Sequence, residues 1–166
     1  PTGLVLENVY RGDDIDLTKI PAPKWHEHDG GYYIGTGDMV IMRDPDTGWI
    51  NYGAYRVQAH DKRLATVMCS KGKHGDMIQK KYHERGLPCP VAVVCGMHPA
   101  LFMIAGLEIP HGRNEYDAAG GLIDLPVLAS ASINTKFMST GSLSIPAVTT
   151  LTGLGNTISG TVSAPN

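Results

Sequence analysis

Several features that mark common functional classes are missing from this sequence of 166 residues. Its 14 Lys and Arg residues are offset by 16 Asp and Glu residues, so there is no basic field to attract nucleic acid or an anionic membrane surface. No apolar run approaches the roughly 20 residues of a membrane-spanning helix, and no charged-then-apolar leader argues for secretion. We therefore expect a cytoplasmic protein that binds neither nucleic acid nor a membrane.

Cysteine is scarce as well, and Cys69, Cys89 and Cys95 lack the CxxC pairing of metal sites. Their odd number and apolar neighbours favour reduced, buried thiols in a cytosolic protein. The length suits one domain with a substantial core. The chain begins at Pro1 rather than Met, which suggests that it is processed or is a piece of a longer protein.

Charge is almost absent from the last segment, where Lys136 is the only charged residue between positions 128 and 166. Ser and Thr supply 14 of these 39 residues, a composition that also occurs in solvated linkers and tails. However, Ser142-Leu-Ser-Ile-Pro146 and Thr157-Ile-Ser-Gly-Thr-Val162 alternate apolar and polar residues. Alternation is typical of strands, so we predict β-structure here.

The rest of the chain predicts a mixture of strands and helices after about 30 irregular residues. Alternating and β-branched patterns, with an Asp44-Pro-Asp-Thr-Gly48 turn, predict an antiparallel meander of strands over residues 32–42, 49–59 and 64–69. A continuous apolar run predicts a buried strand over residues 90–95. Helical spacing predicts helices over residues 76–85, 98–107 and 114–122.

One set of polar residues suggests a metal beside an anion site. Asn51, His74 and Glu115 offer the nitrogen and oxygen ligands of a hard divalent cation, and Arg56 could hold a carboxylate or phosphate in a bidentate grip. Each residue alone could equally be structural, as a turn residue or a charge at a helix start. Asn51 and Arg56 face opposite sides of a regular strand, so a shared site requires a bulge or twist near Gly53.

Two other motifs compete with this site. His26-Glu-His28 places two imidazoles on one face of a strand, where they could bind zinc or iron, but a polar loop is the favoured interpretation. Tyr33-Ile-Gly-Thr-Gly37 is Gly-rich like a phosphate loop, yet it lacks the Lys-Ser/Thr ending of a P-loop. The hydroxyl of Thr36 could still contact a cofactor.

Five motifs stand in order along the chain: Asp29-Gly-Gly-Tyr-Tyr-Ile-Gly-Thr36, Arg43-Asp-Pro-Asp-Thr-Gly48, Asn51-Tyr-Gly-Ala-Tyr-Arg56, Pro90-Val-Ala-Val-Val94 and Asn114-Glu115. Together they resemble the UbiD-type decarboxylases over about residues 1–127. Leu143-Ser-Ile-Pro-Ala147 and Gly153 resemble the next strands of that family more weakly.

The resemblance implies an α+β fold, a split β-barrel like that of flavin reductases, for residues 1–127. Residues 128–166 would be a divergent Ser/Thr-rich β continuation of the same domain. The implied cofactors are prenylated FMN and a divalent metal, Mn²⁺ or Mg²⁺, with K⁺ as a candidate further ion. The implied substrate is an aromatic or α,β-unsaturated carboxylic acid, and the implied assembly of the full-length protein is a homo-oligomer.

Site residues can be carried over from the family by position. The metal ligands are then Asn51, His74 and Glu115, and the catalytic arginine is Arg56. The cofactor-contacting positions are Thr36, Arg56, Lys73 and His74. Lys73 is a departure, because relatives often have Gln there, and it adds a cation near a phosphate.

A second departure concerns the end of the chain. The family's acidic pair, which includes the proton donor, lies in a Glu-Gly-Pro segment beyond Ala164-Pro-Asn166, and the resemblance does not extend to the family's N-terminal and C-terminal domains. Three hypotheses follow: the cofactor domain of a UbiD-type decarboxylase, an FMN-binding split barrel with reductase-like chemistry, or an inactive structural fragment. Arg56 beside a complete metal triad favours the first over the second. The missing acidic pair favours the third for the isolated chain.

Overall fold

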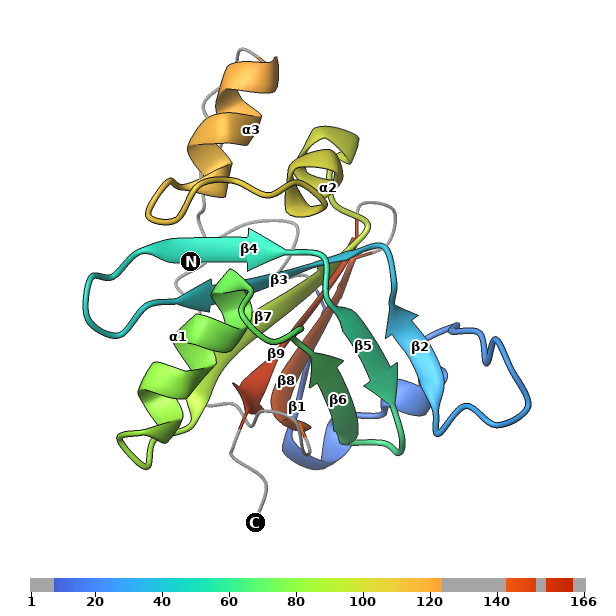
Figure 1. The fold of residues 1–166 in the computed structure, drawn as a ribbon. Coiled ribbons are helices and arrows are strands. Elements are labelled where there is room, and N and C mark those ends of the chain that lie inside the picture. The colour runs from blue at the N-terminus through green and yellow to red at the C-terminus, as the bar shows by residue number, and fades with distance from the viewer. Residues whose placement is uncertain (1–7, 124–142, 152–154, 163–166) are drawn as a thin grey trace.

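The computed structural model describes residues 8–123, 143–151 and 155–162, with side chains up to residue 122 (Figure 1). Its strands are β1 (Val9–Arg11), β2 (Tyr32–Gly35), β3 (Asp38–Arg43), β4 (Ile50–Gly53), β5 (Arg56–Ala59), β6 (Leu64–Met68), β7 (Cys89–Cys95), β8 (Leu143–Leu151) and β9 (Gly155–Val162). Its α-helices are α1 (His74–His83), α2 (Pro99–Ala105) and α3 (Glu115–Ile123). Short 3₁₀ turns, Gly12–Asp14 and Leu17–Lys19, interrupt the otherwise irregular N-terminal part.

The strands pair only in antiparallel fashion in the described parts of the chain, in the order β2-β5-β6-β8-β9-β7-β3-β4, with β1 against β8. Strands β8 and β9 therefore connect two small antiparallel groups, β2-β5-β6 and β7-β3-β4. The sheet curls, so that β2 approaches β7 although other strands separate them in the sheet order. The Cys95 thiol at the end of β7 donates a hydrogen bond to the Ile34 carbonyl of β2 at 3.2 Å. The fold is thus mixed α+β.

The prediction of one continuous strand over residues 32–42 is wrong. The chain bends at Thr36 and Gly37, and β2 and β3 join different groups, since β2 pairs with β5 whereas β3 pairs with β4 and β7. Beside the bend, the Asp38 carboxylate lies 2.4 Å from where a Cβ atom on Gly35 would sit, so a larger residue at position 35 would displace it.

The prediction of one strand over residues 49–59 is wrong for a similar reason. β4 ends at Gly53 because the next amide, Ala54 N–H, donates to the carbonyl of Ala105 at the end of α2, at 2.9 Å, rather than to a strand. The chain then crosses to the other group as β5. A simple meander is therefore not formed, although the strand near residues 64–69 is found as β6.

The other local predictions are confirmed. The turn after β3 closes through Gly48 N–H and the Asp44 carbonyl at 3.0 Å, and the Asp44 carboxylate accepts from the amides of Asp46 and Thr47. The three helices and the buried strand β7 lie where the periodicity places them. Helix α1 begins two residues earlier than predicted, at His74, which makes this residue part of its first turn.

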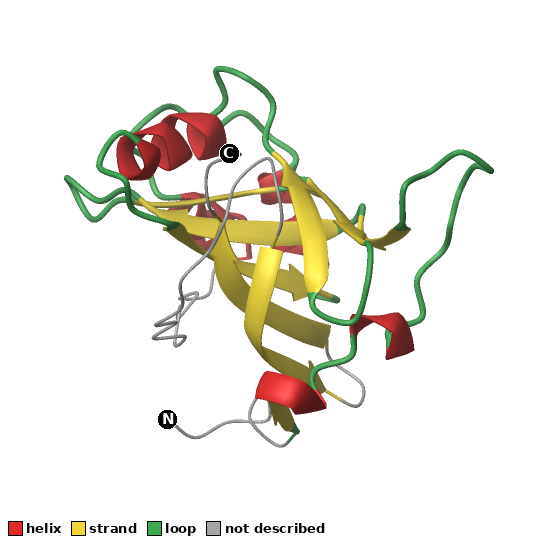
Figure 2. Cartoon of the chain, turned by 90° about the horizontal axis from the view of Figure 1, so that it is seen from below, coloured by secondary structure: helices red, strands yellow, loops and turns green. Residues whose placement is uncertain are grey.

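Side chains from the two faces of β3 enter two different cores. One face contributes to a core enclosed by the strands and α1, whose members include Ile34, Val40, Met42, Val57, Ile78 and Val93. The other face contributes Met39 to a second core beneath α2 and α3, together with Tyr52, Ile104, Tyr116 and Ala119. In Figure 2 the strands occupy the centre of the molecule and the helices lie at its periphery. On β4, Asn51 lies opposite Met42 of the first core, whereas the neighbouring Tyr52 belongs to the second core.

The three cysteines are free thiols, with Cys89 buried and Cys69 and Cys95 partly buried, as expected. Burial raises the pKa of both Cys69 and Cys95 to about 12, so they are not nucleophiles. None of the described helices is long and apolar enough to cross a membrane. The division expected between residues 127 and 128 falls outside the described residues and stays a prediction.

Candidate metal and cofactor site

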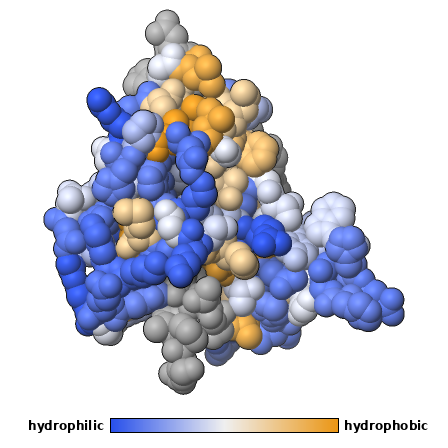
Figure 3. Space-filling view, in the orientation of Figure 1, coloured by the Kyte–Doolittle hydropathy of each residue, from blue (hydrophilic) through white to orange (hydrophobic). Residues whose placement is uncertain are grey.

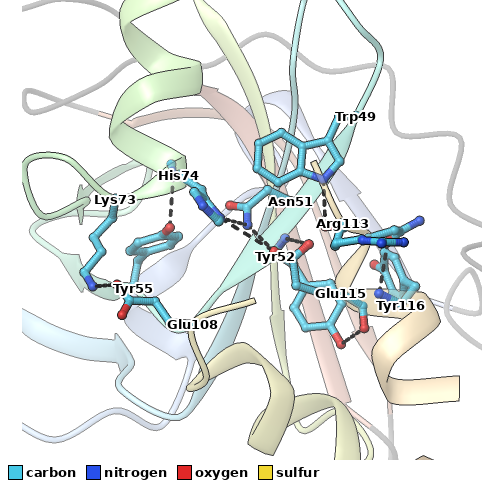
Figure 4. A network of polar contacts seen from close by, with 12 residues as sticks. Trp49, Asn51, Tyr52, Tyr55, Lys73, His74, Glu108, Arg113, Glu115 and Tyr116 are labelled. Carbon is cyan, nitrogen blue, oxygen red and sulfur yellow. Dashed lines mark hydrogen bonds and ion pairs between the residues drawn. The ribbon is translucent and has the colours of Figure 1, made fainter. Parts of the chain in front are cut away.

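Asn51, His74 and Glu115, predicted as metal ligands, come together from three elements (Figure 4). Asn51 lies on β4, His74 begins α1 and Glu115 begins α3. The Asn51 amide nitrogen donates to the Glu115 carboxylate at 2.6 Å and lies 3.5 Å from His74 Nδ1. His74 Nδ1 is 3.9 Å from the same carboxylate oxygen. Residues separated by 64 positions in sequence therefore share one small volume.

The local sequence explains how Glu115 is placed. Asn114 caps α3, because its side-chain oxygen accepts a hydrogen bond from the amide of Tyr116 at 2.9 Å. Tyr52 on β4 fixes the start of the same helix, since its hydroxyl donates to the Glu115 carbonyl at 3.1 Å. Burial raises the pKa of the Tyr52 hydroxyl, so it remains a donor. The carboxylate at the first residue of α3 is thereby held against β4.

Burial controls the electrostatics of these residues. Asn51 and Glu115 are each 2% exposed, and burial raises the pKa of the Glu115 carboxyl above its usual value. Burial, followed by the nearby charge of His111, lowers the pKa of the His74 imidazole. Both shifts disfavour an unpaired charge and leave neutral imidazole nitrogen available as a ligand.

The side-chain oxygen of Asn51 is the observation that fits a cation. It is buried and has no hydrogen-bond partner among the described residues, an arrangement that costs free energy unless a cation or donor meets it. Asn oxygen, His nitrogen and Glu oxygen form a donor set without thiolate, which suits Mn²⁺ or Mg²⁺. In the described ranges, no three His, Cys, Asp or Glu side chains cluster as metal ligands. The set described above contains only two residues of these types, His74 and Glu115, and Asn51 is the third donor.

Arg56 and the three residues line one cavity of about 470 Å³. The bend after Gly53 brings Arg56 to it, so the twist that a shared site requires is present. The cavity wall is completed by apolar side chains and by the chain that follows α2, including Met68 and Leu107. An exposed guanidinium therefore lies at the same cavity as the buried amide, imidazole and carboxylate.

The other predicted cofactor contacts differ in position. Lys73 lines the cavity and forms an ion pair with Glu108, a residue that the sequence did not single out. Thr36 is exposed at the bend between β2 and β3 and is not among the residues that line this cavity. Its predicted contact with a cofactor stays a prediction.

Tyr55 is a second residue that sequence reasoning missed. Its ring lies between two backbone segments, so that a Cβ atom added to either Gly53 or Gly75 would lie 2.9 Å from the ring. Its hydroxyl accepts a hydrogen bond from Gly75 N–H at 3.1 Å, in the turn that begins α1. Tyr55 thus fixes the spacing between the end of β4 and the helix that carries His74. The sequence signal for this packing was the pair of glycines, Gly53 and Gly75, because a glycine leaves room for a ring against the backbone.

The rival motif at residues 26–28 does not form a metal cluster in the described part of the chain. Its three side chains are exposed, and the backbone amide of His26 donates to the Asp29 carboxylate at 2.8 Å. These contacts belong to a polar turn, as the favoured interpretation predicts.

Comparison with known proteins shows which family this chain resembles. The UbiD family, described as the 3-octaprenyl-4-hydroxybenzoate carboxy-lyase Rift-related domain, matches residues 1–140. The pyrrole-2-carboxylic acid decarboxylase of Pseudomonas aeruginosa is 34% identical over 125 residues, which cover 75% of this chain and 25% of that protein. The ferulic acid decarboxylase 1 of Candida dubliniensis is 32% identical over 117 residues, which cover 69% of this chain and 23% of that protein. The chain thus spans about a quarter of the length of these relatives.

Solved structures show the same fold. The UbiD-class enzyme HmfF from Pelotomaculum thermopropionicum, in complex with FMN, matches with a TM-score of 0.71 and 23% identity, over 95% of this chain and 40% of that one. An evolved dimeric form of HmfF, in complex with prFMN, matches with a TM-score of 0.71 and 22% identity, over 95% of this chain and 41% of that one. Because the family match extends over 140 of the 166 residues, the chain belongs to the UbiD family.

Proposed function

We propose that this chain is the cofactor-binding domain of a UbiD-type carboxy-lyase, which decarboxylates an aromatic or α,β-unsaturated acid with prenylated FMN and a divalent metal. The observation that carries the proposal is the convergence of Asn51, His74 and Glu115 around an unpartnered amide oxygen, with Arg56 at the same cavity. The names of the relatives, which are decarboxylases of pyrrole-2-carboxylic and ferulic acid, support the substrate class.

The fold within this proposal is a split β-barrel. The two small strand groups linked by β8 and β9, and the hydrogen bond from Cys95 to Ile34 across the interior, support it.

The metal would be held by the Asn51 amide oxygen, the His74 imidazole and the Glu115 carboxylate. Rotation of the Asn51 amide by half a turn would direct its oxygen toward the other two ligands. A divalent cation there neutralises the buried carboxylate and satisfies the amide oxygen. Phosphate oxygens of the flavin would fill the remaining positions, with Lys73 as an added positive charge.

Arg56 would bind and orient the substrate carboxylate. Its planar, permanently charged fork suits bidentate recognition of a carboxylate and stabilises charge that develops as the C–C bond breaks. When bound, prenylated FMN would supply the electron sink for the electron pair left on the substrate carbon as CO₂ departs, so the protein contributes placement and charge. The apolar wall next to Arg56 suits a flat unsaturated substrate, because it excludes water around the reacting carbon.

The decisive experiment removes the charge of one predicted metal-binding side chain while keeping its shape. Glu115→Gln can still accept the hydrogen bond from Asn51 but weakens cation binding, so Mn²⁺ retained after dialysis should fall and FMN affinity in the presence of Mn²⁺ should drop by roughly tenfold or more. Glu84→Gln, at the exposed far end of α1, is the charge-matched control. Unchanged metal content and flavin affinity in Glu115→Gln would show that the metal assignment is wrong.

The same titration separates the alternative functions. FMN binding that does not depend on a divalent metal favours a reductase-like domain, because such chemistry needs no metal triad. A chain that binds neither metal nor flavin favours a structural fragment without activity.

A further inference from the structure

One ion pair joins two segments across the candidate cavity. The Lys73 ammonium, directly before α1, contacts the Glu108 carboxylate, in the loop after α2 (Figure 4). The two residues are separated by 35 positions, and both line the cavity that holds Asn51, His74 and Glu115. The pair is therefore part of the site rather than of the surface elsewhere.

The pair lies next to the predicted metal ligands. Lys73 directly precedes His74 in the chain, and Glu108 lines the same cavity as His74 and Glu115. Lys73 lowers the pKa of the Glu108 carboxyl, so Glu108 is a full anion at neutral pH. An incoming anionic ligand thus meets one added cation and one added anion at the same wall.

The pair is weakly held, which allows it to exchange partners. The side chains of Lys73 and Glu108 are 51% and 78% exposed, and exposed ion pairs contribute little to stability because water competes and rotamer entropy is lost. A phosphate with about two negative charges is a stronger partner for an ammonium than one solvated carboxylate.

We propose that Glu108 is an internal competitor for the phosphate-binding cation of this site: it holds Lys73 without ligand and releases it to the phosphate of the flavin. The inference rests on the proposed function and adds a residue with a role opposite to that of the metal ligands. Glu108 lowers phosphate affinity in two ways, since it occupies the ammonium and repels the incoming anion. Its removal should therefore tighten binding of a phosphate-bearing flavin alone.

The test compares FMN with riboflavin, which has the same ring system without the phosphate. Flavin fluorescence quenching is titrated in Mn²⁺ at low salt with the unmodified chain, Glu108→Gln, Lys73→Gln and the control Glu84→Gln. We expect Glu108→Gln to bind FMN about three- to tenfold more tightly, with riboflavin affinity unchanged. Lys73→Gln should bind FMN more weakly by a similar factor. Both effects should shrink at about 1 M salt, where charges are screened within about 3 Å.

Each outcome decides between the two proposals. If the unmodified chain binds FMN in a Mn²⁺-dependent manner but Glu108→Gln binds it equally or more weakly, the competitor role is wrong and the proposed function stands. If riboflavin affinity rises as much as FMN affinity, Glu108 acts on the ring pocket and the inference is also wrong. If the unmodified chain shows no FMN binding, the proposed function fails and this inference fails with it. Thermal melts of all variants check that folding is unchanged.

Discussion

Asp38 is a fully buried carboxyl group, and neither of its oxygens has a hydrogen-bond partner among the described residues. Its carboxylate lies against Gly35 of β2, and its backbone lies opposite Cys95 on β7. Burial raises its pKa to about 7. Ionisation of Asp38 should therefore cost the fold free energy near neutral pH.

We predict that Asp38 makes the chain less stable as the pH rises. Between about pH 4 and pH 7 the folded state holds a proton that the unfolded chain releases, so the free energy of unfolding falls across this window and is level above it. At 1.36 kcal/mol per pKa unit, the loss is on the order of 4 kcal/mol. Asp38→Asn should remove this dependence and be more stable than the parent at pH 8, as measured by urea unfolding. Parallel pH profiles for the two proteins would contradict the prediction.

Arg56 is the residue on which turnover should depend most. In the intact enzyme, Arg56→Ala should lower decarboxylation by about 10²–10³, the usual loss at a preorganised charge site, because the substrate carboxylate loses its fixed partner. Mn²⁺ content should remain, since Arg56 is not among the predicted ligands. Arg43→Ala, an exposed arginine that is not among the cavity-lining residues, is the control. Rates of CO₂ release that are equal in both variants would remove Arg56 from the mechanism.

At the scale of elements, the site depends on how β4 and α1 are spaced. Tyr55 lies between them, against Gly53 on one side and Gly75 on the other. Gly75 follows His74 directly, and Gly53 follows Asn51 by two positions. A displacement of the Tyr55 ring would therefore change the distance between two predicted metal ligands.

We predict opposite effects for two helix glycines. Gly75→Ala in α1 places a methyl group 2.9 Å from the Tyr55 ring, so it should destabilise the chain by about 1–3 kcal/mol and weaken Mn²⁺ binding. Gly121→Ala in α3 meets open space and should stabilise by up to about 1 kcal/mol through helix propensity. Urea unfolding and Mn²⁺ titration measure both effects. Equal Mn²⁺ affinity in the two variants would show that Tyr55 does not set the ligand spacing.

At the scale of the whole molecule, apolar side chains gather over α2 and α3 (Figure 3). The exposed fraction is 41% for Phe102, 62% for Met103, 60% for Leu107 and 57% for Leu122. Contiguous exposed apolar side chains favour association with another surface.

We therefore predict that the 166-residue chain alone is marginally stable or self-associates. Sedimentation velocity should show concentration-dependent association, and Met103→Lys should reduce it by placing a charge in the patch. Trp25→Lys, at an exposed apolar side chain outside the patch, adds the same charge and is the control. A monomer with a sharp, highly stable unfolding transition would contradict the expectation.

Turnover is also a property of the whole molecule. Of the carboxyl groups that line the cavity in the described residues, Glu108 is paired with Lys73 and Glu115 with Asn51. Glu115 is a predicted metal ligand and Glu108 is assigned to the cation that meets the flavin phosphate, so neither is expected to return a proton to carbon, which general acid catalysis requires. We expect no CO₂ release when this 166-residue chain is incubated with prenylated FMN, Mn²⁺, K⁺ and a panel of cinnamic, hydroxybenzoic and heteroaromatic acids. Release above a metal-free blank would show that these residues supply the acid themselves.

The sequence by itself determined the types of element and the chemistry of the ligands. Helical periodicity, the apolar run at residues 90–95 and the turn residues near Asp44 report local preferences, and those preferences survive in the fold. Five motifs in order along the chain indicated the family. The residue types of Asn51, His74 and Glu115 indicated the candidate metal donors, because residue type alone limits what can bind a hard cation.

Only the tertiary structure decided how those pieces meet. The end of β4 at Gly53 coincides with the hydrogen bond from Ala54 to the distant Ala105, which a local pattern does not contain, and each predicted long strand became two strands in different groups. The Lys73 contact with Glu108 joins segments that only folding brings together. Strand partners and charge partners are long-range interactions, and their free energy is set by the whole packed chain rather than by any window of sequence.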